Sequence, residues 1–311
     1  MRQEYSFTKR NVLDTCPRAY FYEYFAANNK VEFDANRKAR IKEAKKLSSV
    51  HLLAGIWLHQ FIRRFLVSYP NVPSNLESEC CAIFDNAVRR SRSPSRRRDA
   101  QGLLLLEFVF DDPEAEDRAT ASRETLTRAI HHFRHTPEVQ AVWRDVLRGE
   151  PWIEKPIGGL PKVDGYGIRG QIDFAVRHDQ EIRIVDWKSG LQEGGHDSLQ
   201  LFIYALWANK QYSIKPESIS VRRVFLGEGR VEQERGLDAT ALSRGEARLV
   251  QDVTLMREQQ DYGKAGAEEA FTPCLKVNVC RRCKFQRECP EGQALVQSSR
   301  TSSSFTLPVL A

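Results

Sequence analysis

Two neighbouring stretches of the sequence, GQIDFAV at 170–176 and EIRIVDWK at 181–188, combine strand-like patterns with acidic residues. The residues His178-Asp179-Gln180 between them are typical of a turn. Asp173 falls within the first predicted strand, and Asp186 falls at the end of the second. A tight hairpin would therefore bring two carboxylates close together.

This acidic pair and a nearby lysine predict a metal-dependent site. Two carboxylates at short range raise one another's pKa, so a divalent cation is the natural way to stabilise them. Lys188 lies two residues after Asp186 and therefore on the same face of the strand. A cation polarises a phosphate and lowers the pKa of a bound water, while a lysine holds that water or stabilises the transition state. The pattern favours hydrolysis of a phosphodiester.

The competing interpretation is a surface hairpin with alternating charges, because the sequence D-x-K is common. Residues 182–185 are apolar, however, and place Asp186 at the end of a buried strand. An unpaired charge is costly there, so we favour a functional site.

Three residues on predicted helices are candidates for the same site. Gln200 and Tyr204 are four residues apart on the helix after the hairpin, so both point from one face toward the strands. Alternatively, Gln200 forms a capping box with Asp197, and Tyr204 belongs to the core. His59 lies on a mostly apolar helix, where a lone histidine is usually a hydrogen-bonded core residue unless other ligands need it.

The composition indicates a folded protein. The 311 residues allow one large domain or two smaller ones, and 41% of them are hydrophobic, which excludes wholesale disorder. No run of about 18 apolar residues could span a membrane, and the N-terminus lacks the apolar stretch of a signal peptide. We therefore expect a cytoplasmic protein whose seven cysteines serve metal or thiol chemistry rather than disulfides.

The order of elements predicts an α/β fold in which helices surround a central sheet. Helices are expected at 7–25 (broken at Cys16-Pro17), 51–68, 103–110, 121–148, 197–209 and 238–261, and strands at 152–157, 165–176, 181–187 and 218–227.

Basic residues point to an anionic partner. The chain has 47 lysines and arginines against 41 acidic residues, a formal net charge of +6. The segment 89–102 is predicted to be an exposed insertion, and it contains Arg89, Arg90, Arg92, Arg96, Arg97 and Arg98. Arginine suits bidentate binding of phosphates, which favours a nucleic-acid contact, and the alternative is an inert solvated loop.

The C-terminal region carries a second candidate metal site. Cys280, Cys283 and Cys289 supply three thiolates within ten residues, whereas a soft metal site normally takes four ligands. Cys274 would complete a local zinc site, and Cys16 would complete a site that joins the two ends of the chain. The residues alone leave both alternatives open.

Four motifs occur in the order GxxxH (55–59), GQID (170–173), VDWK (185–188) and QxxxY (200–204). Together they resemble the motif series of the RecB-like nucleases of the PD-(D/E)xK superfamily. That family includes the nuclease domains of bacterial helicase–nucleases and the CRISPR-associated spacer-acquisition nucleases. The resemblance implies a restriction-endonuclease-like core with a mixed sheet.

The resemblance also implies roles for the site residues. The ligands of a Mg²⁺ or Mn²⁺ ion would be His59, Asp173, Asp186 and the backbone carbonyl of Trp187. Lys188 would be catalytic, and Gln200 with Tyr204 would orient it or contact the DNA strand.

Iron–sulfur members of the family carry one cysteine before a CPR-type sequence and a C-terminal C-x2-C-x5-C, as this chain does at 16–18 and 280–289. By resemblance, Cys16, Cys280, Cys283 and Cys289 would bind a [4Fe-4S] cluster that joins the two ends, with Zn²⁺ as the alternative. Closing so long a loop removes roughly 5–6 kcal/mol of unfolded-state freedom as an upper bound.

We expect the chain to divide into five regions. They are a basic N-terminal segment with the first cluster cysteine (1–50), a helical region with the arginine-rich insertion at 89–102 (51–150), the nuclease core (151–230), a C-terminal helix and cysteine segment (231–297), and a flexible tail (298–311).

We therefore expect a metal-dependent deoxyribonuclease that acts on DNA with single-stranded character, as an exonuclease rather than an endonuclease. No nucleotide-binding sequence GxxxxGK[ST] occurs, so a separate helicase or other protein is a candidate partner. DNA repair, CRISPR adaptation and anti-phage defence are pathways that fit. The alternatives are a catalytically idle nucleic-acid-binding scaffold and a zinc-stabilised endonuclease.

Overall fold

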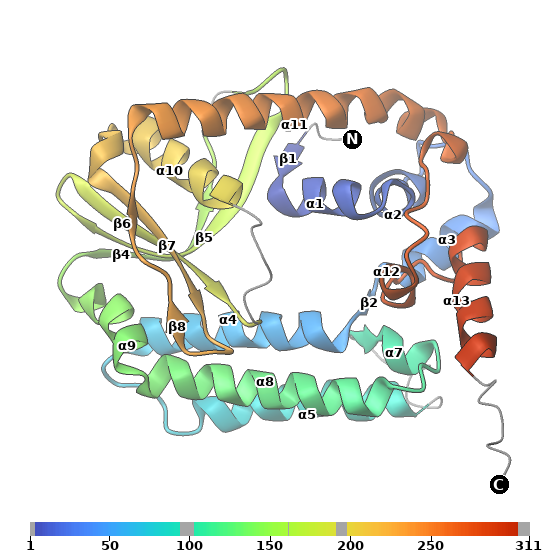
Figure 1. The fold of residues 1–311 in the computed structure, drawn as a ribbon, viewed down its shortest axis with the longest axis horizontal. Helices are drawn as coiled ribbons and strands as arrows, with labels where there is room; N and C mark the ends of the chain where they lie inside the picture. Colours follow the sequence, from blue (N-terminus) through green and yellow to red (C-terminus); the bar gives the residue numbers. More distant parts are fainter. Residues whose placement is uncertain (1–3, 94–102, 161, 191–197, 304–311) are drawn as a thin grey trace, which may run out of the picture.

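The computed structural model describes residues 4–93, 103–160, 162–190 and 198–303 (Figure 1). Its helices are α1 (Phe7–Thr15), α2 (Pro17–Phe21), α3 (Ala35–Ala44), α4 (Val50–Ser68), α5 (Leu76–Arg92), α7 (Leu106–Val109), α8 (Ala115–His135), α9 (Pro137–Trp143), α10 (Ser198–Tyr212), α11 (Ala239–Ala265), α12 (Val277–Arg281) and α13 (Pro290–Ser303). None of these helices combines the length and the apolar character needed to cross a membrane.

The strands are β1 (Glu4–Ser6), β2 (Leu47–Ser48), β3 (Leu104–Leu105), β4 (Glu150–Ile157), β5 (Gly167–His178), β6 (Glu181–Lys188), β7 (Ile219–Phe225), β8 (Arg230–Val231) and β9 (Arg235–Gly236). In the described residues, seven of them form a sheet in the order β1-β5-β6-β7-β8, with β4 beside β5 and β9 beside β7. β5 is antiparallel to β4 and β6, whereas β6 is parallel to β7. The expectation of a mixed central sheet is confirmed.

Helices cover both faces of this sheet (Figure 1). Ile182 and Ile184 of β6 belong to a core shared with α10, α11 and the N-terminal helices. Val185 and Trp187 belong to a second core shared with α4, α5 and α8. Successive side chains of a strand point to opposite faces, so β6 contributes to both cores.

Most elements expected from the sequence are present with shifted ends. The helix pair broken at Cys16-Pro17 appears as α1 and α2, and the helix expected at 51–68 is α4. The segment 103–110 begins with β3 before α7, and α13 extends through residues 298–303 of the expected tail. β1 was not expected, and it pairs in parallel with the start of β5.

The arginine-rich segment is described only in part. α5 continues to Arg92, where Nε of that arginine lies 2.8 Å from Glu116 on α8. Arg96, Arg97 and Arg98 lie outside the described residues. The contact of this segment with phosphates stays a prediction.

Buried and partly buried side chains also join the two ends of the chain. Arg18 and Arg37 both bind the carboxylate of Glu268, at 2.9 and 2.8 Å. Tyr22 and Arg37 also donate hydrogen bonds to the backbone carbonyl of Glu288, at 2.9 and 2.8 Å. The N-terminal helices therefore contact the C-terminal segment through charged groups as well as through the region of the cysteines.

The start of α4 is held by two side chains. Ser49 accepts a hydrogen bond from the backbone N–H of Leu52 at 3.1 Å, as N-cap residues commonly do. Glu107 is buried and accepts one from the backbone N–H of Val50 at 3.1 Å. Burial raises the pKa of this carboxyl group. These contacts fix the position of the helix that carries His59.

Replacing Glu107 by alanine is expected to destabilise the protein, because the buried N–H of Val50 loses its partner. The free energy of unfolding should fall by about 1–3 kcal/mol in urea denaturation. Glu124→Ala, on the exposed face of α8, is the matched control and should change it by less than about 0.5 kcal/mol. Equal losses for both variants would contradict this role of Glu107.

Candidate active site and cysteine pocket

The backbone pairing of β5 with β6 stops just before the two predicted acidic residues. The last pair joins Phe174 and Val185, and the next position would set Asp173 opposite Asp186. There, Oδ2 of Asp173 instead accepts a hydrogen bond from the N–H of Trp187 at 3.0 Å. The two carboxylates lie near enough to repel each other electrostatically.

Asp186 and Lys188 lie on the face of β6 that packs against α10, two and four residues after Ile184. Nζ of Lys188 is 2.6 Å from Oδ2 of Asp186, and Asp186 is only 2% exposed. The ion pair offsets the cost of burying this carboxylate. The predicted neighbourhood of Asp186 and Lys188 therefore exists in the structure.

α10 continues this row of polar side chains. Nζ of Lys188 is 3.4 Å from Oε1 of Gln200, and Nε2 of Gln200 donates to the hydroxyl of Tyr204 at 2.7 Å. Burial and the charge of Asp173 raise the pKa of Tyr204, so its hydroxyl stays protonated. The spacing of Gln200 and Tyr204 along the helix brings both beside Lys188. Their part in catalysis stays a prediction.

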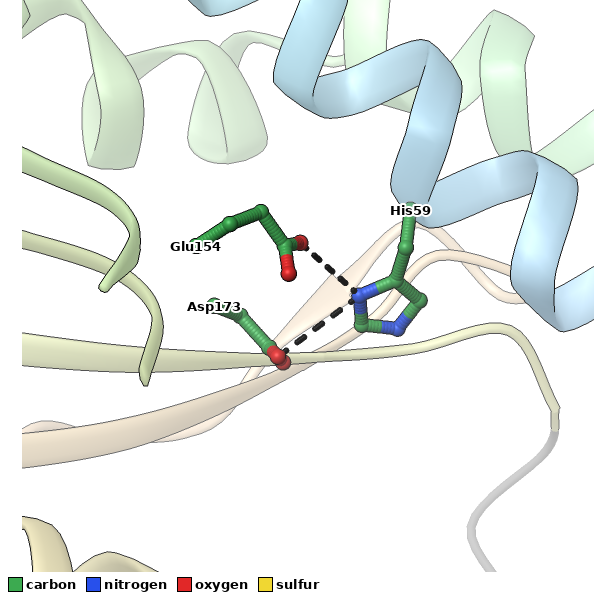
Figure 2. A group of neighbouring side chains, drawn as sticks. All are labelled: His59, Glu154 and Asp173. Carbon is green, nitrogen blue, oxygen red and sulfur yellow. Dashed lines mark ion pairs between the residues drawn. The ribbon is translucent and has the colours of Figure 1, made fainter. Parts of the chain in front are cut away.

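Figure 2 shows His59, Glu154 and Asp173 pointing toward one another from α4, β4 and β5. Nδ1 of His59 is 3.6 Å from Oδ1 of Asp173 and 3.5 Å from Oε1 of Glu154. One donor atom of each residue lies within 4.8 Å of the other two. α4, the helix predicted to carry a metal ligand, therefore places His59 beside the acidic residues of the sheet.

Trp187 contributes to the site through its backbone. Its indole packs in the core beside Phe133 and Phe174, with ring centroids 5.6 and 5.8 Å apart. Its N–H holds Asp173, and its carbonyl as a metal ligand stays a prediction.

Glu154 was missed in the sequence. Its neighbours in β4 pair with residues 172 and 174 of β5, so Glu154 lies opposite Asp173. Its φ of 49° is unusual for a strand residue, and its Oε2 accepts a hydrogen bond from Gln171 at 2.6 Å. Within WIEKPI, Glu154 is simply an acidic residue in a predicted strand, and nothing local marks it as part of a site. The register of β4 on β5 is what identifies it.

The acidic surroundings shift the pKa of two groups. Burial, followed by the charge of Asp186, raises the pKa of Asp173 to about 7. Burial alone would lower the pKa of His59, but its hydrogen bond to Glu154 and the charges of Asp173 and Glu154 raise it to about 9. Protons therefore compete with a cation for both groups.

The charges and donor atoms of the site fit a divalent cation. Three carboxylates (Glu154, Asp173 and Asp186) meet one lysine, which leaves two negative charges when His59 is neutral. Carboxylate oxygens suit Mg²⁺ and Mn²⁺, and an imidazole nitrogen favours the transition metal of the two. These residues would hold such an ion, which would polarise a phosphate and activate a water.

The second candidate site is a pocket of about 540 Å³ between the N-terminal and C-terminal segments. It is lined by five cysteines, Cys16, Cys274, Cys280, Cys283 and Cys289. Cys274 lies near enough to Cys16 and Cys280 to raise the pKa of both thiols. Both candidates for the fourth ligand therefore lie at the same pocket.

The surroundings of these sulfurs suit thiolate ligands. Backbone N–H groups donate to three of them, from Ala19 to Cys16, from Phe285 to Cys283 and from Gly292 to Cys289. Such hydrogen bonds stabilise thiolates in metal clusters. Burial raises the pKa of Cys283 to about 12, so without a metal this thiol stays protonated.

Gly292 leaves room beside the sulfurs. A Cβ atom at this position would lie 3.3 Å from the sulfur of Cys289 and 3.6 Å from that of Cys280. A larger residue would therefore occupy space next to two candidate ligands.

Binding of Mn²⁺ is expected to strengthen as the pH rises from 6 to 8. Because the pKa values of Asp173 and His59 are raised by folding, the metal-free protein loses stability as these protons leave, whereas a cation takes their place. The rise in melting temperature caused by Mn²⁺ should be larger at pH 8 than at pH 6. A rise that is equal or smaller at pH 8 would contradict the assigned ligands.

The chain is similar to known proteins. The family model of the PD-(D/E)XK nuclease superfamily matches residues 4–290. The chain is also similar to the Gene 69 protein of Mycobacterium phage D29, with 26% identity over 157 residues that cover 48% of this chain and 54% of that protein. This chain therefore spans about half the length of that relative. The match over nearly all described residues shows that the chain belongs to the PD-(D/E)XK nuclease superfamily.

Proposed function

We propose that this protein is a divalent-metal-dependent deoxyribonuclease that hydrolyses the phosphodiester bonds of DNA with single-stranded character. The observation that carries the proposal is the ion pair of the buried Asp186 with the partly exposed Lys188, whose ammonium is 2.6 Å from the carboxylate, next to Asp173 and His59. The membership of the chain in a nuclease superfamily supports it.

Lys188 is the residue we assign to charge stabilisation at the reacting phosphate. Its ammonium is held between Asp186 and Gln200, which limits its rotamers and keeps its charge at the end of β6. Such a preorganised cation stabilises the negative charge that develops on the phosphate or holds the attacking water. Tyr204 orients Gln200 through the hydrogen bond between them.

The cation would be held by His59, Asp173 and Asp186, with the carbonyl of Trp187 as a further oxygen donor. When bound, it supplies polarisation of the phosphate and a water of lowered pKa. Asp173 keeps its orientation because Oδ2 is fixed by the N–H of Trp187, which leaves Oδ1 facing His59.

We further propose that the protein acts as an exonuclease with a separate helicase or other protein as partner, in the cytoplasm. The arginine-rich segment 89–102 would contact the phosphates of the DNA. DNA repair, CRISPR adaptation and anti-phage defence are the pathways in which such an activity fits.

We infer that Cys16, Cys280, Cys283 and Cys289 bind a [4Fe-4S] cluster. The shared pocket and the N–H groups directed at the sulfurs support this inference.

Purified protein, handled without oxygen, should degrade labelled single-stranded DNA in Mn²⁺ or Mg²⁺ and leave blunt duplex DNA largely intact. Chelation of the cation should stop the reaction. Tight DNA binding with no cleavage under any of these conditions would instead identify an idle scaffold protein.

Asp186→Asn and Lys188→Ala should each reduce cleavage by at least about 10²–10³-fold, because each removes charge from the reacting centre. Lys210→Ala, an exposed lysine of α10, is the control and should cleave like the parent. Initial rates on a labelled oligonucleotide measure the effect, and circular dichroism checks the fold. A variant of Lys188 with the parent rate would show that the site is assigned wrongly.

The parent protein should be brown, with broad absorption near about 400 nm from iron–sulfur charge transfer. Cys16→Ser should bleach this colour and lower the melting temperature, whereas Cys274→Ser should leave both nearly unchanged. Iron, sulfide and zinc are measured on both variants. A colourless parent with one zinc that is lost only in Cys274→Ser would favour the local zinc site.

A further inference from the structure

Glu154 belongs to none of the motifs that led to the site, yet its carboxylate is directed into it (Figure 2). Oε2 is held by Nε2 of Gln171 at 2.6 Å, and Oε1 points to Nδ1 of His59 at 3.5 Å. The Glu154 side chain is 16% exposed, so this is a partly desolvated anion and not a surface charge.

The distribution of counter-charges leaves Glu154 and Asp173 short of a cation. The ammonium of Lys188 lies against Asp186 at 2.6 Å. In the described part of the chain, the basic group that Glu154 and Asp173 share is the imidazole of His59, whose Nδ1 is 3.5 and 3.6 Å from their oxygens. An imidazole carries at most one positive charge, so it balances only one of the two carboxylates.

The distances among the three donor atoms suit an ion placed between them. Nδ1 of His59 is 3.5 and 3.6 Å from the two carboxylate oxygens, and all three atoms lie within 4.8 Å of one another. Neighbouring ligands of an octahedral ion at roughly 2.1 Å lie about 3 Å apart. Movements of about half an ångström at flexible side chains would therefore close the site.

We propose that Glu154 is a ligand of the divalent cation, together with His59 and Asp173, and that this combination selects Mn²⁺ over Mg²⁺ and Ca²⁺. The proposal rests on the proposed function, because the ion is the cofactor of the nuclease. The nitrogen donor provides the selectivity, since Mg²⁺ and Ca²⁺ prefer oxygen ligands while Mn²⁺ also accepts imidazole. Glu154 supplies a second carboxylate oxygen beside Nδ1 of His59, in addition to that of Asp173.

Direct binding of Mn²⁺ to the full-length protein tests the proposal without the use of activity. Glu154→Gln keeps the size and the contact with Gln171 but removes the anionic oxygen. Its dissociation constant for Mn²⁺, from the electron paramagnetic resonance signal of the free ion, should rise by about 10- to 100-fold. Glu150→Gln makes the same chemical change on the same strand at an exposed position, and it should bind like the parent.

A second variant distinguishes direct coordination of the cation by Glu154 from an electrostatic effect of its charge at a distance. Glu154→Asp keeps the negative charge but withdraws it by one methylene, so Mn²⁺ binding should weaken as in Glu154→Gln. This variant also decides the matter if Glu154→Gln fails to melt cooperatively. Parent-like Mn²⁺ affinity in Glu154→Asp would overturn the proposal, as would equal affinities of the parent for Mn²⁺ and Mg²⁺.

The outcome is independent of whether the protein cleaves DNA. Mn²⁺ binding that depends on Glu154 in a protein without nuclease activity would support the ligand and reject the proposed function. Nuclease activity in a protein whose Mn²⁺ affinity ignores Glu154 would reject the ligand and keep the function.

Discussion

Asp173 and Asp186 place two negative charges next to each other where little water can reach them. Burial, followed by the charge of Asp186, raises the pKa of Asp173 to about 7, because both effects disfavour its ionised form. Lys188 offsets the charge of Asp186, and His59 offsets part of the charge of Asp173 and Glu154. The remaining excess is the physical reason for a divalent cation, and the fold around the site serves to keep these charges together.

The sheet and the helices on its two faces together hold the charged groups of the site in place. β5 and β6 lose their backbone ladder at Asp173 and Asp186, and a hydrogen bond from Trp187 to Asp173 holds them instead. α4 brings His59 from one face of the sheet, and α10 brings Gln200 from the other. Because the groups come from different layers, small shifts of a single helix would change the distances between them.

The two ends of the chain meet at two chemically different places. One is the set of partly buried ion pairs in which Glu268 contacts both Arg18 and Arg37. The other is the group of cysteines at the adjacent pocket. The ion pairs do not depend on redox state, so they hold the two ends together independently of the cysteines.

Local patterns in the sequence were sufficient for the parts of the site that lie on single elements. Asp186 and Lys188 are neighbours because side chains two residues apart share a face of a strand, and Gln200 and Tyr204 are neighbours because four residues make one helical turn. The spacing of apolar residues likewise identified α4, α10, α11 and the central strands, because the side chains that face the core recur at regular intervals along each element. The place of His59 in the site followed from its motif, since its apolar helix alone suggested a core residue.

No comparable pattern in the sequence predicted the contacts between elements that are far apart along the chain. Glu154 meets His59 and Asp173 only through the register of β4 on β5, which no local pattern of either strand specifies. Arg18 and Glu268 are 250 positions apart, and Cys16 lies at the same pocket as Cys274 and Cys280 only after the ends have come together. The sequence by itself therefore determined which candidate residues share a face of one strand or one helix. Which of them meet, and with what net charge, depended on how the chain packs, because electrostatic energy depends on distances that only the packed fold sets.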